Sequence, residues 1–236
     1  VTPNIALIPE LKKRGFEIHY IGSKTGIEKE LIGNFDIPYY GISSGKLRRY
    51  FDVKNFTDPF RILKGYSEAK KLIKKIKPDV IFSKGGFVTV PVVKAASRQK
   101  VPCVLHESDI SPGLANRLCI PSATAICANF PETIANLPED KAYLTGTPIR
   151  SELFSGNRLK GLDFCGFTAN KPVILVIGGS LGSVRVNEAV REILPKLLEK
   201  YQVIHLCGKD KVDESLKQTE GYVQFEYIQK ELCDLL

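Results

Sequence analysis

The 236-residue chain contains no methionine and no tryptophan. No stretch of it approaches the roughly 20 consecutive apolar residues that a membrane-spanning helix needs. Its six cysteines are scattered and form no C-x-x-C pair, which argues against a zinc site or a disulfide framework and favours a reducing compartment. No basic-then-apolar leader precedes the first predicted helix, so the sequence gives no support for secretion. The remaining composition is that of an ordinary globular protein.

Negative charge is scarce in the first part of the chain. Residues 1–100 hold 20 Lys and Arg against 9 Asp and Glu, a net charge of +11, whereas residues 101–236 carry −3. This asymmetry favours an anionic partner for the first part, either a nucleic acid or a membrane surface; the alternative is a solvated basic face. Nucleic acid is the less favoured partner, because no helix-turn-helix, RNP or zinc-finger pattern is present.

Apolar, β-branched runs alternate with helical patterns along the chain. Continuous runs of this kind are typical of parallel strands that are buried on both faces. They predict strands at 16–22, 79–83, 101–106, 123–128, 173–178, 202–207 and 222–225. Helices are predicted after Thr2 and over 55–76, 88–97, 183–198 and 212–217. The alternation predicts an α/β fold with doubly wound parallel sheets.

An irregular stretch rich in Gly, Asn and Lys, residues 155–171, separates two blocks of strands and helices. It predicts a first domain over 1–146, a linker and hinge over 147–171, and a second domain over 172–236. Both domains are expected to be truncated, because the first opens on a helix and the second stops after about three strands.

Glycine-rich turns follow several predicted strands, at the sheet edge where open α/β sheets bind ligands. The strongest is Gly178–Gly182, because its glycines let the backbone approach a phosphate and the helix beginning near Ser183 directs N–H groups at it. It matches neither the dinucleotide-binding pattern nor the P-loop. The alternative is that the glycines of this turn only allow the strand and the helix to pack closely. A second turn contains Gly85 and Gly86.

Polar residues cluster after the strand predicted at 101–106, where His106, Glu107 and Asp109 precede a helix that contains Asn116. Such residues are costly in a core and are tolerated in a cleft. They indicate either acid–base and hydroxyl-binding chemistry or helix capping around a hydrogen-bonded histidine. Arg150 closes the TGTPIR segment, where its guanidinium suits either a diphosphate or an interdomain ion pair.

Phe56, Phe60, Leu63 and Tyr66 recur at helical spacing, with Lys and Arg on either side. This pattern is typical of an amphipathic helix at a membrane surface and equally of a core helix. Each cation near an anionic leaflet contributes about 1 kcal/mol. We expect these four side chains to be at least partly exposed and to dock on an anionic membrane surface; the alternative is packing against the sheet.

The segments VTPNIALIPELKKRG, SKGGFVTVPVVKAA, VPCVLHESDISPGLANRL, LTGTPIR and VIGGSLGSVRVNEAV, in this order, resemble the MurG family of bacterial N-acetylglucosaminyltransferases, within glycosyltransferase family 28. The resemblance implies two Rossmann-like domains of the glycosyltransferase B type. It further implies inverting, metal-independent and cofactor-free transfer of N-acetylglucosamine from UDP-GlcNAc to the undecaprenyl-linked muramoyl-pentapeptide of peptidoglycan synthesis, on the cytoplasmic side of the plasma membrane. Alternatives are a diacylglycerol glycosyltransferase, a UDP-GlcNAc 2-epimerase or a non-catalytic membrane-docking fragment.

The resemblance also implies roles for single residues. His106 and Glu107 become catalytic candidates, although the histidine favoured as base in the family would precede Val1. The substrate-binding residues that it implies are Arg150, Gly179, Ser180, Gly182, Asn187, Asp109, Asn116 and, for the uracil, Ile228. Phe60 and Leu63 fall where the family carries its membrane patch. Asp109 stands where many members have asparagine, and its charge disfavours a diphosphate close by.

Overall fold

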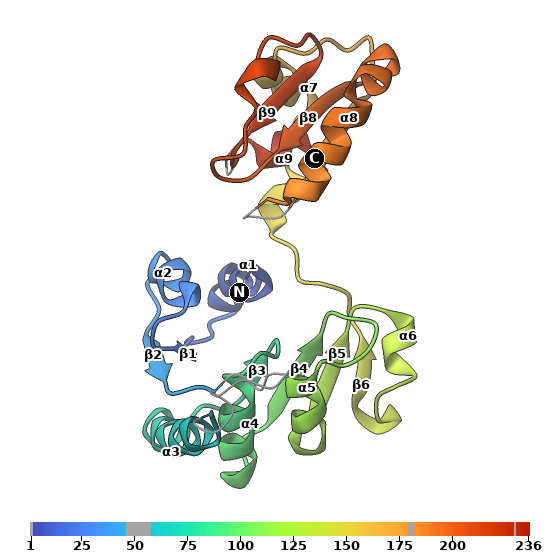
Figure 1. The fold of residues 1–236 in the computed structure, drawn as a ribbon. Helices are drawn as coiled ribbons and strands as arrows, with labels where there is room; N and C mark the ends of the chain where they lie inside the picture. Colours follow the sequence, from blue (N-terminus) through green and yellow to red (C-terminus); the bar gives the residue numbers. More distant parts are fainter. Residues whose placement is uncertain (1, 46–57, 179–181, 229) are drawn as a thin grey trace. The chain divides into compact units, whose positions relative to one another are not determined.

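The computed structural model describes the whole chain except residues 1, 46–57, 179–181 and 229 (Figure 1). The chain divides into two compact units, residues 1–149 and residues 150–236. In both units the described strands pair only in parallel. The predicted α/β fold with parallel sheets is therefore confirmed.

The first unit contains a two-stranded and a four-stranded sheet, with strand orders β1-β2 and β3-β4-β5-β6. Its strands are β1 (Tyr20–Ser23), β2 (Tyr39–Ile42), β3 (Ile81–Ser83), β4 (Cys103–Glu107), β5 (Ala125–Ala128) and β6 (Ala142–Leu144). Its helices are α1 (Thr2–Lys13), α2 (Ile27–Gly33), α3 (Asp58–Ile76), α4 (Thr89–Arg98), α5 (Leu114–Cys119) and α6 (Pro131–Ile134). Short 3-10 turns cover Ile120–Ser122 and Glu139–Lys141.

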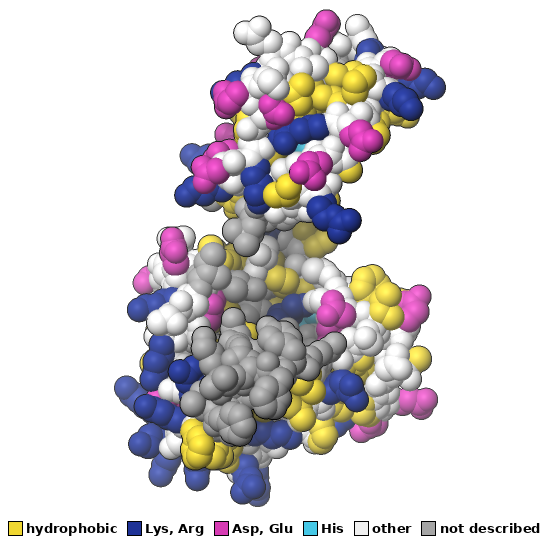
Figure 2. All heavy atoms as spheres, in the orientation of Figure 1, with side chains coloured by type: hydrophobic (Ala, Val, Ile, Leu, Met, Phe, Trp, Pro, Cys, Tyr) yellow, Lys and Arg dark blue, Asp and Glu magenta, His cyan; other side chains and the backbone are white. Residues whose placement is uncertain are grey.

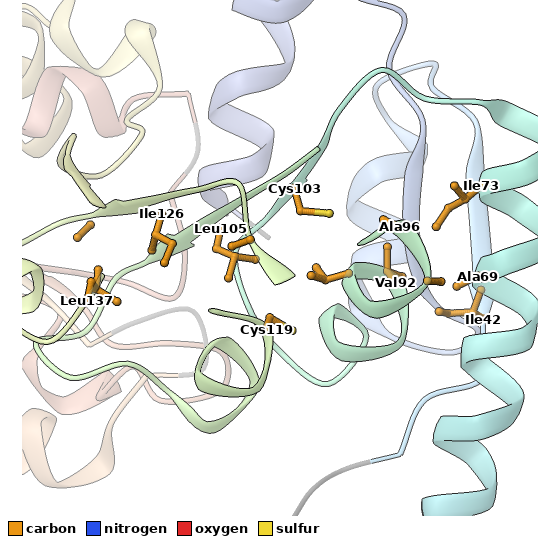
Figure 3. Close-up of a cluster of buried hydrophobic side chains, with 14 residues drawn as sticks. Ile42, Ala69, Ile73, Val92, Ala96, Cys103, Leu105, Cys119, Ile126 and Leu137 are labelled. Atoms are coloured by element: carbon orange, nitrogen blue, oxygen red, sulfur yellow. The ribbon is translucent and has the colours of Figure 1, made fainter. Parts of the chain in front are cut away.

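The core of the first unit lies between the sheet and helices α3, α4 and α5 (Figure 3). Ala69 and Ile73, one helical turn apart on α3, face the buried residues of α4, which include Val92 and Ala96. On the sheet side, Leu105 of the central strand β4 is fully buried. This packing fixes the carboxyl ends of β3 and β4, from which the candidate site is built.

Helix α3 is attached to the end of β2 by a close backbone approach. A side chain at Gly65 would collide with the carbonyl oxygen of Ser43, so only glycine allows this contact. One turn further on, the carboxylate of Glu68 accepts a hydrogen bond from the Ser43 backbone N–H and pairs with the ammonium of Lys24 (3.0 Å). These contacts determine which face of α3 is turned inward.

The second unit is a three-stranded parallel sheet of order β7-β8-β9. Its strands are β7 (Val173–Ile177), β8 (Gln202–Leu206) and β9 (Tyr222–Phe225). Its helices are α7 (Arg158–Cys165), α8 (Val184–Lys200) and α9 (Leu232–Leu235), and 3-10 turns cover Ser151–Phe154 and Glu214–Leu216. Alternate residues of β8 point to opposite faces of the sheet, so Val203 packs with Leu194 of α8 while Ile204 packs with Leu235 of α9.

Part of the stretch predicted to be irregular, residues 155–171, forms helix α7 in the second unit. The side chain of Asn157 caps its N-terminus by accepting from the backbone N–H groups of Leu159 and Lys160. Gly166 ends it in the left-handed conformation (φ 66°). The backbone of Gly161 lies against the carbonyl of Asp234 in α9. The helix therefore depends on a contact with a segment that is distant in the sequence.

Candidate functional site

The carboxylate of Glu107, the last residue of β4, organises the loop that follows the strand. Its Oε1 accepts hydrogen bonds from the backbone N–H groups of Ser108 (2.8 Å) and Asp109 (3.0 Å). Its Oε2 accepts from the backbone N–H of Gly113 (3.0 Å) and from the side-chain amide of Asn116 (2.8 Å). Glu107 is only 5% exposed. The loop is thus folded around a buried carboxylate whose lone pairs are all engaged.

These contacts also determine the charge state of Glu107. Burial alone would raise its pKa, but the four hydrogen-bond donors stabilise the carboxylate and hold the pKa below its ordinary value. A general base needs a free lone pair and a pKa near the working pH. In this structure Glu107 is the anchor of the loop, and its catalytic role stays a prediction that these contacts do not favour.

His106 is 2% exposed and is held on both sides of its ring. One ring nitrogen, Nε2, lies 2.9 Å from the Gly146 carbonyl, and the other, Nδ1, lies 2.6 Å from the Lys84 ammonium. Because a carbonyl only accepts and an ammonium only donates, the proton is on Nε2. Burial, together with the Lys84 charge, lowers the pKa of His106 against the opposing effect of the Gly146 hydrogen bond. Both ring nitrogens of His106 are thus engaged in this structure, and its catalytic role stays a prediction.

Lys84 is the residue of this site that the sequence analysis missed. It follows β3, and its ammonium contacts the Ser108 hydroxyl (2.5 Å) as well as His106. The signal that identifies it is its place in the chain, because it stands between a buried strand and the Gly85–Gly86 turn, at the edge of the sheet where ligands bind. Burial lowers the pKa of Lys84, against the opposing charge of Glu107.

Asn116 is buried beneath the same loop. Its amide nitrogen also donates to the His106 carbonyl (3.2 Å), and its Oδ1 has no hydrogen-bond partner among the described residues. The backbone of Gly85, in the left-handed region at φ 84°, passes directly beside this amide. The structure therefore brings His106, Glu107 and Asn116 together, while Asp109 is exposed at the rim of the loop.

The loop after β7 contains Gly179 and Ser180, two predicted donor contacts that lie outside the described residues. Gly182, at its end, has φ 65° and lies so close to the Cys207 carbonyl that no side chain would fit. Helix α8 begins two residues later, with Ser183 as its side-chain cap. A strand, a glycine loop and a helix N-terminus in this order suit a phosphate group. The role of these residues stays a prediction.

Asn187, predicted to contact the donor, is buried under α8 instead, with 2% exposure. Its amide nitrogen donates to the Cys207 carbonyl (2.9 Å), and its Oδ1 accepts from Nε2 of His205 (3.1 Å). The other ring nitrogen of His205 accepts from the Tyr222 hydroxyl (2.8 Å). The amide of Asn187 thus joins α8 to β8 and its end, and the substrate-binding role of this residue stays a prediction.

We expect His205 to make the second unit sensitive to acid. His205 is fully buried, and this burial, with the nearby charge of Arg191, lowers its pKa from 6.5 to about 4. Between these values the unfolded chain binds a proton that the folded chain excludes, so stability falls as the pH drops. At about 1.4 kcal/mol per pKa unit, the loss over the window is about 3 kcal/mol. Urea unfolding at several pH values measures it, and an equal pH dependence in His205→Gln would contradict the assignment.

Two further predicted contacts have different surroundings. Ile228 is 6% exposed and packs beside Leu206 in the core of the second unit. Its side chain is thus part of that core, and the uracil contact of this residue stays a prediction. Arg150, the first residue of the second unit, pairs with Glu152 two residues later (3.1 Å). Its guanidinium stays partly exposed, and its role at a diphosphate stays a prediction.

The four apolar residues predicted to dock on a membrane do not share one environment. Phe60 is 74% exposed and Leu63 is 66% exposed. Tyr66 is partly exposed and packs against the core of the first unit, so its membrane role stays a prediction, and Phe56 lies outside the described residues. Figure 2 shows Lys and Arg side chains around a hydrophobic patch at the lower left of the first unit, where Figure 1 places α3. The exposed lysines of α3 are Lys64, Lys70, Lys71, Lys74 and Lys75.

The described part of the chain lacks two features. None of its helices is long and apolar enough to span a membrane. In the same residues, no group of three or more His, Cys, Asp or Glu side chains is placed to hold a metal ion.

Fold and loops together define a protein of two Rossmann-like α/β units, with candidate ligand sites at the carboxyl ends of parallel strands. Residues 1–128 match the glycosyltransferase family 28 N-terminal domain, and residues 173–233 match the family 28 C-terminal domain. The chain belongs to glycosyltransferase family 28.

Two relatives of this chain are longer than the chain itself. It is 69% identical, over 235 residues, to the UDP-N-acetylglucosamine–N-acetylmuramyl-(pentapeptide) pyrophosphoryl-undecaprenol N-acetylglucosamine transferase of Lachnoclostridium phytofermentans, covering 100% of this chain and 66% of that protein. It is 60% identical to the protein of the same name from Clostridium botulinum, strain Loch Maree, covering 67% of it. The chain thus spans about two thirds of the length of these relatives.

Solved structures show the same fold. MurG of Acinetobacter baumannii aligns with a TM-score of 0.69 at 26% identity, covering 97% of this chain and 63% of that one. UDP-GlcNAc 2-epimerase from Neisseria meningitidis, bound to UDP-GlcNAc, aligns with a TM-score of 0.63 at 16% identity, covering 97% of this chain and 69% of that one. At this identity the epimerase is evidence of a shared fold alone.

Proposed function

We propose that the protein containing this chain transfers N-acetylglucosamine from UDP-GlcNAc to the undecaprenyl-linked muramoyl-pentapeptide of peptidoglycan synthesis. The observation that carries the proposal is the 69% identity, along the whole chain, to a transferase named for this reaction. The same reading places the protein at the cytoplasmic face of the bacterial plasma membrane as a peripheral enzyme.

The second unit is the proposed donor site. The loop after β7 leads to α8, whose N-terminal N–H groups and positive dipole end suit the diphosphate of UDP-GlcNAc. Arg150 adds a guanidinium that forms paired hydrogen bonds to phosphate oxygens once it leaves Glu152. These groups stabilise the charge that develops on the departing UDP, so the proposed reaction needs no metal ion.

The first unit is the proposed acceptor site. The muramoyl 4-hydroxyl attacks the anomeric carbon of the donor from the side opposite the leaving UDP, which inverts the configuration at that carbon. A base must remove the hydroxyl proton during the attack. Neither Glu107 nor His106 suits this task, because every hydrogen-bonding atom of both side chains is engaged within the unit. We assign these two residues to shaping the acceptor site instead.

A transfer assay tests the proposal. The full-length protein is incubated with UDP-GlcNAc and a short-chain lipid-linked muramoyl-pentapeptide, with and without EDTA, and the products are separated by mass spectrometry. We expect a product that is heavier by one N-acetylglucosamine, formed at the same rate in EDTA. Conversion of UDP-GlcNAc to UDP-ManNAc with the acceptor unchanged would replace the transferase by an epimerase.

We further propose that α3 docks the protein on an anionic membrane. Phe60 and Leu63 are exposed at the start of the helix, and Lys64, Lys71 and Lys74 follow on the same side. Apolar side chains that enter the lipid interface, flanked by lysines that reach anionic headgroups, are the pattern of an interfacial helix. The acceptor site would then face the surface that carries the lipid substrate.

Phe60→Ser combined with Leu63→Ser is expected to weaken liposome binding by tenfold or more, because each burial of such a side chain in an apolar phase is worth about 1.5–3 kcal/mol. Thermal stability should hardly change, since both side chains are already exposed. Sedimentation with anionic vesicles measures the binding, which should also weaken as salt shortens the Debye length from about 10 Å at 0.1 M to about 3 Å at 1 M.

The second unit offers a matched control for this experiment. Phe154 is 77% exposed and Leu159 is 70% exposed, so changing both to serine removes the same chemistry from another surface. The control should bind vesicles like the wild type. Equal losses of binding in both double variants, or unfolding of the α3 variant, would contradict the docking role of α3.

A further inference from the structure

The turn that follows β8 is held at three points. Within the turn, the backbone N–H of Lys211 donates to the Gly208 carbonyl (3.2 Å), and both Gly208 and Asp210 have positive φ, 88° and 57°. From α8, the guanidinium of Arg191 donates to the Lys211 carbonyl (2.6 Å). From the end of β9, the carboxylate of Glu226 accepts from the backbone N–H of Asp210 (2.9 Å). The backbone from which the Lys211 side chain extends is thus fixed.

The side chain of Lys211 extends from this turn to the glycine loop after β7, residues 178–182. Its ammonium donates a hydrogen bond to the Gly182 carbonyl (3.2 Å), 29 residues earlier in the chain. The backbone of Gly182 also lies directly against the Cys207 carbonyl, at the end of β8. Lys211 is neither fully buried nor fully exposed. The end of the glycine loop is therefore tied to the β8 turn by close packing and by one side-chain hydrogen bond.

This hydrogen bond fixes the direction of one peptide group. The Gly182 carbonyl and the Ser183 N–H belong to the same planar trans peptide, in which C=O and N–H point in opposite directions. Because the carbonyl is turned toward Lys211, the N–H is turned away from it. The Ser183 nitrogen lies 3.1 Å from the place where a Cβ on Gly178 would be, so it is close to the end of β7. Ser183 caps α8, and its N–H is therefore one of the donors at the amino end of the helix.

We propose that Lys211 is a positioning residue for the donor, because its ammonium orients the peptide between Gly182 and Ser183 so that the Ser183 N–H faces a phosphate of UDP-GlcNAc. The identity of this phosphate rests on the proposed function, in which the amino end of α8 receives the donor diphosphate. Lys211 acts through the peptide and not by touching the ligand. Without the ammonium, the left-handed glycine (φ 65°) permits this peptide to rotate, and a rotated peptide would turn its carbonyl oxygen toward the phosphate.

The experiment compares Lys211→Met, Lys211→Arg and Lys171→Met in the full-length protein. Lys171 is the matched control, because its ammonium also donates to a backbone carbonyl, that of Leu198 (2.8 Å), but near the carboxyl end of α8. Calorimetry measures the affinity for UDP, and displacement of UDP measures the affinity for uridine, which has the same base and ribose but no phosphate. Steady-state kinetics gives the KM for UDP-GlcNAc and the KM for the lipid-linked acceptor separately.

We expect Lys211→Met to weaken UDP binding about tenfold, which is about 1.4 kcal/mol and close to the value of one hydrogen bond to a charged group. Uridine affinity should not change, and the KM for UDP-GlcNAc should rise while the acceptor KM stays the same. Lys211→Arg should recover part of the UDP affinity, and Lys171→Met should match the wild type. Unchanged UDP affinity in Lys211→Met would overturn the proposal, and so would an equal loss of uridine affinity.

An NMR measurement separates positioning of the peptide from the charge of the lysine alone. Without ligand, Lys211→Met should shift the carbonyl signal of Gly182 and the amide signal of Ser183. If neither signal moves although UDP affinity falls, the effect comes from charge alone and the positioning role is overturned. In the wild type, UDP should shift the Ser183 amide signal and uridine should not. This wild-type result covers the case in which Lys211→Met fails to fold, and a Ser183 signal that ignores UDP would overturn the proposal.

The same measurements distinguish this inference from the proposed function. If the wild type neither binds UDP nor transfers sugar, the proposed function falls and this inference falls with it. If it binds UDP without transferring sugar, the UDP and uridine affinities still decide the role of Lys211. If it binds UDP and transfers sugar, and Lys211→Met does both equally well, the proposed function stands and this inference alone falls.

Discussion

Replacing Glu107 with alanine is expected to destabilise the first unit by about 3–5 kcal/mol, the range for removing one partner from a buried charged network. The change leaves the donors of Ser108, Asp109, Gly113 and Asn116 without their acceptor. Urea unfolding, followed by hydrogen exchange of the β4 amides, measures the loss. The β8 amides of the second unit should keep their protection.

Asp109→Ala is the control, because it removes an exposed carboxylate two residues away. This change should lower the free energy of unfolding by less than about 0.5 kcal/mol.

The pH dependence of stability provides a second check. Since the folded state lowers the pKa of Glu107, its contribution is fully present above the unfolded pKa and is lost as the pH falls through the folded one. The difference in the free energy of unfolding between the wild type and Glu107→Gln should therefore become smaller at acidic pH. A stable, inactive Glu107→Ala protein would instead restore the catalytic reading.

Gly182→Ala is expected to destabilise the second unit by about 2–5 kcal/mol. Part of this cost is the left-handed backbone, which disfavours any residue with a Cβ by about 1–2 kcal/mol. The remainder comes from a collision of the new methyl group with the Cys207 carbonyl, which neither backbone can avoid without moving the loop. Thermal unfolding measures the loss, and UDP affinity should fall with it if the loop holds the diphosphate.

Gly166 separates the two causes. It has almost the same backbone angle as Gly182, φ 66° against 65°, but no atom lies within 4 Å of the place where its Cβ would be. Gly166→Ala should therefore show the backbone cost alone. If Gly182→Ala and Gly166→Ala cost the same, close packing against Cys207 is not what requires glycine in this loop.

Local sequence pattern predicted the elements that are apolar along their whole length. The strand predicted at 202–207 is β8, which is buried on both faces, as its mostly apolar, β-branched run indicates. Strand β2 and helix α7 were missed because their signals are weak. Helix α7 contains a glycine, and its apolar residues are spread around the helix without forming one face. It is completed by Asn157, Gly166 and the contact between Gly161 and α9.

Helical spacing alone did not determine which side of α3 faces the core. Phe60 and Tyr66 were grouped by their recurrence, yet Phe60 is exposed and Tyr66 is packed inward. The reason is that an amphipathic pattern shows which residues share a face of the helix, but not how the helix is rotated against the rest of the protein. The contacts of Gly65 and Glu68 with Ser43 set the rotation, and they come from a strand 22 to 25 residues earlier.

The sequence by itself determined the fold class and the family, because these depend on strand runs, glycine turns and polar residues at strand ends. Only the tertiary structure decided which polar atoms are free to act. The partners of His106 are 22 and 40 residues away in the chain, and those of Asn187 are 18 and 20 residues away. Whether a buried polar group is satisfied depends on such distant partners. That is why the sequence did not show that Glu107 and Asn187 are held by internal hydrogen bonds, and why Lys84 was missed.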